Sequence, residues 1–260
     1  MTHMKRSGFS LVELSIVLVI LGLLVGGILA GQSLVRASEL RAVMTEYNRY
    51  ATATKAFRDK YFAIPGDMTN ATSLWGVSTS CSGTSATGTC NGNGDGQITP
   101  GGSSATGEAY QFWNQLALAG LIQGTYTGTA GATSGTDATA GVDIPFSKIP
   151  GGAWYAWYWG TIGDSGSNSY QGVNYGNGLH IGGTLASHWP SNPLFKPEEA
   201  WNIDTKMDDG KPASGHVIAR FWADLCASAD SGGSTNTNLA ASYRLSDTNV
   251  RCTLYFTQAF

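Results

Sequence analysis

A glycine-rich stretch of the chain carries polar residues at a spacing that could bind a cation. Asn91, Asn93 and Asp95 alternate with single residues in CNGNGDGQITP, and Gly96 and Ile98 follow. This order matches the first eight positions of an EF-hand-type calcium loop, where carboxylate and amide oxygens bind the ion and a glycine makes the sharp turn. The spacing therefore predicts a Ca²⁺ site.

The end of this stretch departs from the calcium-loop pattern. Gly102 stands at the twelfth position, where a bidentate glutamate belongs, and the nearest candidate for that role is Glu108. Calcium would thus need a geometry different from that of an EF-hand. A plain Gly/Asn turn is the alternative. We expect no required cofactor, and Ca²⁺ is the only ion that we consider as a ligand.

Two other groups of polar residues have a plainer interpretation. GDSGS, residues 163–167, is similar to the nucleophile motif of chymotrypsin-type proteases, which need a histidine upstream of the serine. Here only His3 precedes it, so we expect a polar loop, no catalytic residue and no enzyme activity. For Asp204, Asp208 and Asp209 we expect a solvated helix end, with an acidic site as the alternative.

The chain has four cysteines, which allow three pairings. The pairs close in sequence, Cys81 with Cys90 and Cys226 with Cys252, would close loops of about 10 and about 27 residues, each stabilising by roughly 2.5–3.5 kcal/mol on the chain-entropy model. Neither pair has C-x-x-C spacing, and no histidine suggests zinc. We therefore expect two disulfides and a compartment outside the cytoplasm.

A long apolar segment near the N-terminus contains one carboxylate. Residues 14–35 carry no charge, and 22 helical residues are enough to cross a hydrocarbon core of about 30 Å. Glu13 directly precedes them, although a charge at the centre of a membrane helix costs roughly 2.5–3.5 kcal/mol. We expect a partner for this carboxylate; the alternative is that Glu13 is tolerated near the membrane interface.

The residues around Glu13 resemble a known family. Lys5-Arg6-Ser7-Gly8 followed by FSLVEL is similar to the class III leader of type IV prepilins and type II secretion pseudopilins. The resemblance implies that a prepilin peptidase cuts after Gly8 and methylates Phe9, and that Glu13 is the family's membrane glutamate. It also implies three segments: a leader (1–8), a transmembrane or filament-core helix (9–35), and an amphipathic continuation with a globular head (36–260).

The same resemblance implies a function. In the family, the new amine of one subunit pairs with the membrane glutamate of another, so we expect a structural subunit of a type IV pilus-like filament. Expected partners are copies of itself, prepilin peptidase, and an inner-membrane assembly platform with its ATPase. The precursor would lie in the inner membrane and the mature filament outside the cell. The alternatives are a periplasmic pseudopilin and a membrane-anchored enzyme or sugar-binding module.

The elements that must position these residues follow from hydrophobic periodicity. A helix from Phe9 to about Phe62 is predicted, ending before Pro65-Gly66, with a buried stripe over 40–61 and with Glu46 off that stripe. A second helix is predicted from GEAYQFWNQLALAGLI and a short one from EEAWNIDTKMDDG. GAWYAWYWGTI is expected to form a strand, and HVIARFWADL and NVRCTLYFT are expected to be C-terminal segments that Cys226 and Cys252 hold together. By resemblance, the fold class is α+β and pilin-like, with an antiparallel sheet and large Gly/Ser/Thr-rich loops.

Charge and composition exclude one class of partner. The formal net charge is −3, and the 15 Lys and Arg residues form no run longer than two. Nucleic-acid binding needs a basic patch or stripe. We therefore expect no nucleic-acid partner.

Overall fold

A computed structural model describes residues 10–81, 87–100, 107–131, 135–160, 174–221, 226–228 and 241–260. Contacts divide the chain into two compact units, Met1–Arg41 and Ala42–Phe260. We call the second unit the head and describe each unit by itself.

Helix α1 (Leu11–Tyr61) supplies all the described structure of the first unit except Ser10. It is long and apolar enough to cross a membrane, with a mean hydropathy of 2.7 over its most apolar window, none of which is buried. The helix continues through Gly22, Gly26, Gly27 and Gly31, and a Cβ at any of them would meet nothing within 4 Å. These glycines therefore leave open surface on the single chain.

Within the head, one face of α1 is buried against the core. Val43, Tyr50 and Phe57 lie on the expected stripe and are buried, and the Tyr50 ring packs edge-on against Trp113 and Trp154. Burial of this ring raises the pKa of Tyr50 to about 12. The stripe read from the sequence thus joins the head half of α1 to the rest of the head.

Glu46 corrects the sequence interpretation, which placed it off the buried stripe. Only 5% of the residue is exposed. Its carboxylate accepts hydrogen bonds from Ser147 Oγ at 2.8 Å, the Lys148 amide at 2.8 Å and Trp154 Nε1 at 2.9 Å. Because buried charge is costly unless it is hydrogen-bonded, these three donors explain how a carboxylate is accommodated here.

The end of α1 has an unusual backbone. Phe62 has a φ of +54°, and its amide donates to the Arg58 carbonyl at 2.8 Å. This left-handed position after a helix usually holds glycine. The chain then turns at Pro65 and Gly66, where a Cβ on the glycine would lie 2.4 Å from the Glu108 carbonyl oxygen.

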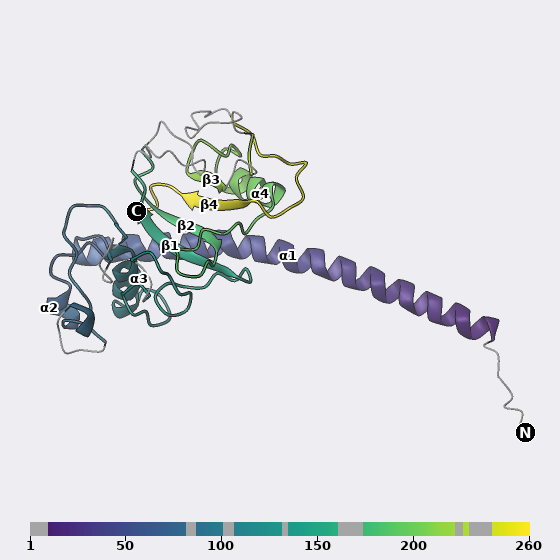
Figure 1. Ribbon diagram of the computed structural model, residues 1–260, viewed down its shortest axis with the longest axis horizontal. Coiled ribbons are helices and arrows are strands. Elements are labelled where there is room, and N and C mark those ends of the chain that lie inside the picture. The colour runs from purple at the N-terminus through teal and green to yellow at the C-terminus, as the bar shows by residue number, and fades with distance from the viewer. Residues whose placement is uncertain are drawn as a thin grey trace, which may run out of the picture. The chain divides into compact units, whose positions relative to one another are not determined.

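Four antiparallel strands form one sheet in the order β1-β2-β4-β3. The strands are β1 (Gly152–Tyr158), β2 (Asn177–Gly183), β3 (Val217–Phe221) and β4 (Cys252–Phe256). Strand β1 was expected from the sequence. β3 and β4 lie in the two expected C-terminal segments, and β2 was not anticipated. Figure 1 shows the head half of α1 beside this sheet, which fits an α+β, pilin-like layout.

Shorter helices complete the head. They are α2 (Thr72–Trp75), a 3₁₀ turn (Thr79–Cys81), α3 (Glu108–Leu118) and α4 (Pro197–Met207). Helix α3 packs on β1, and α4 packs on β3 and β4. Helix α4 begins with Pro197 at its first turn, and the Glu199 carboxylate accepts the Lys196 amide at 2.9 Å.

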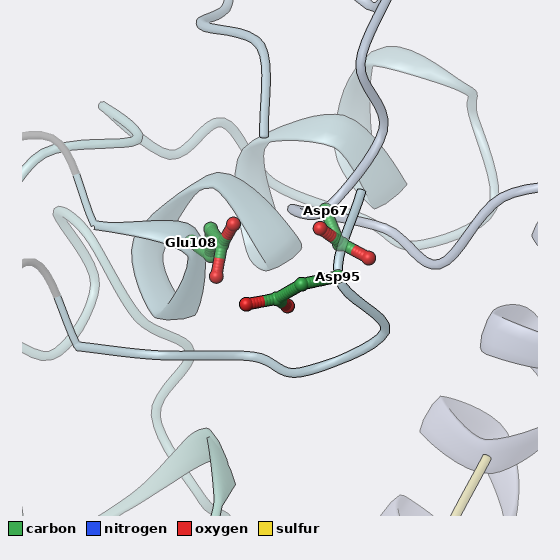
Figure 2. A group of neighbouring side chains, drawn as sticks. All are labelled: Asp67, Asp95 and Glu108. Atoms are coloured by element: carbon green, nitrogen blue, oxygen red, sulfur yellow. The ribbon is translucent and has the colours of Figure 1, made fainter. Parts of the chain in front are cut away.

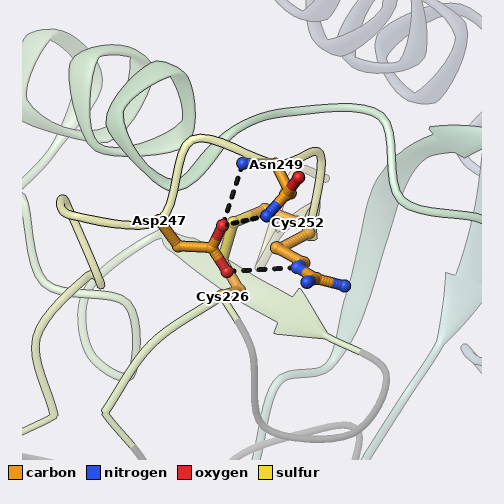
Figure 3. A network of polar contacts seen from close by, with 5 residues as sticks. Cys226, Asp247, Asn249 and Cys252 are labelled. Carbon is orange, nitrogen blue, oxygen red and sulfur yellow. Dashed lines mark hydrogen bonds and ion pairs between the residues drawn. A yellow bond between two sulfur atoms is a disulfide. The ribbon is translucent and has the colours of Figure 1, made fainter.

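Both disulfides join the pairs that the sequence favoured, Cys81–Cys90 and Cys226–Cys252. The second bond ties β4 to a segment 26 residues earlier. Just before β4, the Asp247 carboxylate accepts the amide and side-chain nitrogens of Asn249 and Nε of Arg251 (Figure 3). These bonds stabilise the charged form and so lower the pKa of Asp247, and the bonds from Asn249 have the largest effect.

Candidate functional site: the N-terminal helix and an acidic cluster in the head

Glu13 lies in the first turn of α1 and closes a capping box. Its Oε2 accepts the Ser10 amide at 2.8 Å, while Ser10 Oγ accepts the Val12 amide at 3.3 Å. The first amides of a helix have no intrahelical partner, so this reciprocal pair satisfies two of them. Within one chain the carboxylate therefore already has a role, which is to begin the helix at Leu11.

The processing residues expected from the sequence, Gly8 and Phe9, lie outside the described residues. They precede the capping box directly in the sequence. A new amine on Phe9 would lie within about one helical turn of Glu13 along the chain. The positive end of the helix and a carboxylate thus occur together at the start of an apolar helix.

The head brings three carboxylates together. One oxygen each of Asp67, Asp95 and Glu108 lies within 4.8 Å of the others (Figure 2). Asp67 and Glu108 are buried, and Asp95 is exposed. The sequence analysis proposed Asp95 and Glu108 and missed Asp67, which follows the turn at the end of α1 and carries no motif.

Backbone amides of the loop hold two of these carboxylates. Asp67 accepts the amides of Gly94 at 2.6 Å and Gly96 at 2.8 Å. Glu108 accepts the amides of Asn93 and Thr99, both at 3.1 Å. The buried charges are therefore hydrogen-bonded, and the loop is fastened at both ends of its turn.

The two asparagines of the predicted calcium loop have separate partners. Asn91 Oδ1 accepts the Thr72 amide at 2.9 Å, at the start of α2. Asn93 Oδ1 accepts the Asp95 amide at 2.9 Å, and its Nδ2 donates to Asp95 Oδ2 at 3.0 Å. These bonds shape the Gly/Asn turn that was the alternative interpretation.

The acidic cluster suits a hard cation and is also explained without one. Carboxylate oxygens are the ligands that Ca²⁺ prefers, and an oxygen that accepts one N–H keeps a second lone pair. The same N–H bonds, however, already compensate the charges of Asp67 and Glu108. Calcium binding stays a prediction.

A second group of aspartates lies at the end of α4. Asp204, Asp208 and Asp209 each place an oxygen within 4.8 Å of the others. Asp204 is fully buried, so the expectation of a solvated end is wrong for this residue. Burial raises the pKa of Asp204 to about 7, although hydrogen bonds from the Tyr243 hydroxyl and the Gly210 amide oppose the rise.

Comparison with known proteins bears on the N-terminal helix. A family model described as the prokaryotic N-terminal methylation motif matches residues 3–29. No significant match was found among curated proteins or among solved structures. The matched residues contain Gly8, Phe9, Glu13 and the first part of α1.

Motif and helix together indicate the class of the protein. An N-terminal methylation motif on a long apolar helix fits a type IV pilin-like class III leader. It supports the assignment of this chain to the type IV pilin or pseudopilin type. Proteins of this type are structural rather than catalytic. The motif implies processing by prepilin peptidase, and the helix fits a membrane-anchored precursor.

Proposed function

We propose that this chain is a structural subunit of a type IV pilus-like extracellular filament. Prepilin peptidase cuts between Gly8 and Phe9 and methylates Phe9, and the chain then polymerises through α1. The assembly platform and its ATPase drive this step. The observation that carries the proposal is the coincidence of the methylation motif with an apolar helix whose first turn holds Glu13.

Charge pairing aligns the N-terminal helix of each subunit with that of its neighbour. In lipid, an unpaired carboxylate is costly and a paired one much less so. The amine of one mature subunit pairs with the Glu13 carboxylate of the next. Because Oε2 also holds the Ser10 amide, the capping box orients the carboxylate before the neighbour arrives.

The alternative within the same class is a pseudopilin of a type II secretion system. It shares the leader but forms a short periplasmic assembly. The large head, rich in Gly, Ser and Thr, favours a surface filament. Electron microscopy of filaments sheared from cells that express the gene at its natural level distinguishes the two, since only a pilus gives long surface filaments.

Intact-mass analysis tests processing. The assembled protein is expected to lack residues 1–8 and to carry one additional methyl group. Loss of this leader removes Lys5 and Arg6 and no acidic residue, so the formal charge changes from −3 to −5. Residues 1–8 on assembled material would contradict the proposal.

Glu13 variants test assembly and separate charge from capping. Glu13→Gln keeps an oxygen that can accept the Ser10 amide but removes the charge, whereas Glu13→Leu removes both. We expect both variants to be inserted and cleaved, and both to yield little filament. If cells that make only the Glu13→Leu subunit, without wild-type subunits, produced filament at wild-type quantity, the pairing mechanism would be refuted. Normal assembly of Glu13→Gln with failure of Glu13→Leu would show that capping, and not charge, matters.

A further inference from the structure

Phe62, at the end of α1, combines two unfavourable features. It is 92% exposed, the highest value among the large apolar residues described in the head. It also has a φ of +54°, in the left-handed region where a side chain is strained. The exposed ring gains almost no packing within the single chain, and backbone strain of this kind points to a functional contact.

The head also has an uncharged cavity of about 500 Å³. Its described lining residues are all uncharged, and they include Ala117 and Leu118 of α3, Tyr126 and Val142. A cavity of about 150 Å³ already accommodates a benzene ring. The cavity therefore has room for an aromatic ring, and no ionised group among the described lining residues loses water when the ring enters.

The cavity and Phe62 lie at different levels along α1. The Arg49 guanidinium lies over the Tyr50 ring, which packs edge-on against Trp113. The next residue, Asn114, lines the cavity, so the cavity wall lies near Arg49. From Arg49 to Phe62 the helix advances 13 residues, or roughly 20 Å at 1.5 Å per residue. If Phe62 of one copy contacted the cavity of another, the second copy would therefore be displaced from the first along the direction of α1.

We propose that the Phe62 ring of one subunit inserts into the cavity beside Tyr126 and Leu118 of the next copy of this chain. The contact is heterologous, because it joins two different surfaces of the same head. A heterologous contact with an axial shift does not close into a ring, and it repeats along a filament. The inference rests on the proposed function and adds a contact between heads.

The size of this contact determines its role. An aromatic side chain buries about 150–250 Å², far below the roughly 1,200 Å² that a stable interface buries. Phe62 therefore strengthens and orients a polymer that the N-terminal helices already hold together. Heads that are not joined by those helices are expected to stay apart.

Cross-linking tests the geometry while keeping Phe62. All four natural cysteines are in disulfides, so Ala63→Cys with Val142→Cys introduces the free thiols. After sheared filaments are treated with a short bismaleimide, denaturing electrophoresis should give a ladder of dimers, trimers and longer species. Each single variant should give none, and Ala63→Cys with Leu245→Cys is a matched control because Leu245 and Val142 are both 49% exposed. Dimers alone, or no cross-link in normal filaments, would overturn the inference.

Phe62→Gly provides a second test that does not need the thiols. Glycine relieves the left-handed backbone, so the melting temperature of the detergent-solubilised subunit should stay the same or rise. The quantity of sheared filament should fall about tenfold, the scale expected for a buried aromatic anchor. Ala117→Trp, which fills the cavity, should cause the same loss, whereas Leu245→Ala, at an exposed leucine outside the cavity lining, should not. Filament at wild-type quantity from Phe62→Gly would overturn the inference.

These results are distinguishable from failure of the proposed function. If the wild-type chain forms no filament, or if Glu13→Leu assembles normally, the proposed function fails. If filaments form from processed subunits but the cysteine pair gives no ladder, only the Phe62 contact is wrong.

Discussion

At the scale of single residues, Glu46 connects α1 to the start of the sheet. Its carboxylate accepts from the loop at Ser147 and Lys148 and from Trp154 in β1. A buried donor that loses its acceptor costs about 1–3 kcal/mol, and bonds to a charged acceptor are the stronger ones. The energetic role of Glu46 is thus to satisfy the buried Trp154 donor and to hold the partly buried loop at Ser147 and Lys148.

Glu46→Ala should therefore lower the free energy of unfolding by about 2–4 kcal/mol, because two or three donors lose their acceptor. Glu46→Gln keeps one acceptor oxygen and should cost less. Urea unfolding of the detergent-solubilised full chain, followed by tryptophan fluorescence, measures both, since all eight tryptophans lie in the head. Equal effects of the two variants would contradict the role of the carboxylate as a shared acceptor.

The acidic cluster gives a second prediction at this scale. If Ca²⁺ binds Asp67, Asp95 and Glu108, about 1 mM Ca²⁺ should raise the melting temperature of the solubilised chain relative to chelator, because a ligand of the folded state alone stabilises it. Asp95→Asn should abolish the difference. Asp209→Asn, in the second acidic group, is the matched control and should leave it intact. Identical melting curves with and without calcium would leave only the interpretation as a Gly/Asn turn that binds no calcium.

Periodicity predicted which segments are helical but not which polar residues they bury. Glu46 lies between apolar positions of α1 as any solvent-facing residue does, and only its distant partners near 147–154 make burial favourable. Asp67 likewise follows the turn after α1 with no motif. Both residues depend on contacts far apart in sequence, whereas Glu13 and Gly8 could be found because the signal that identifies them is local.

At the scale of elements, β2 shows why one strand was missed. Its sequence, NGLHIGG, contains three glycines and no alternation, and glycine disfavours strands. In the sheet, a Cβ at Gly178 would lie 2.4 Å from the Phe256 carbonyl oxygen, and one at Gly182 would lie 2.2 Å from that of Pro190. The residues that hide the strand in the sequence are those that allow its neighbours to approach.

Strand β1 was predicted because its local pattern agrees with its environment, and β4 has such a pattern too. β1 is rich in aromatic residues, and β4 is buried along its whole length, CTLYF. Each fits a pleated, buried surface without special backbone demands. The prediction of α1 succeeded for the same reason, since its apolar run and the Pro65-Gly66 stop are both local.

At the scale of the whole head, three buried ionisable groups with shifted pKa values contribute to the response of stability to pH. Burial raises the pKa of Asp143 and of Asp204 from an ordinary 3.8 to about 7 in each case. Burial also lowers the pKa of His180 well below its ordinary value of 6.5, and the nearby Arg220 charge lowers it further. Burial thus favours the neutral form of all three.

The two aspartates and the histidine act in opposite directions. Between pH 4 and pH 7 the folded state holds protons on Asp143 and Asp204 that the unfolded state has lost, so these groups make stability fall as pH rises. Below about pH 6.5 the unfolded state protonates His180 and the folded state does not, so this group makes stability rise with pH. Each contributes at most about 1.4 kcal/mol per pH unit.

Asp204→Asn isolates one of these contributions. Asparagine is neutral at every pH, so the variant should gain stability relative to wild type as pH rises from 5 to 8, with most of the gain below pH 7. At pH 5 the folded wild type holds Asp204 as a neutral acid, which like asparagine has one carbonyl oxygen for the Tyr243 hydroxyl or the Gly210 amide, so the change with pH, and not the difference at pH 5, reports the titration. Urea unfolding of the solubilised full chain at both pH values measures the difference. Asp247→Asn is the exposed control and should change little relative to wild type between pH 5 and pH 8, because the folded state lowers the pKa of Asp247 and its titration is confined to below about pH 5. A constant difference between Asp204→Asn and wild type would mean that Asp204 is ionised in the folded head throughout this range.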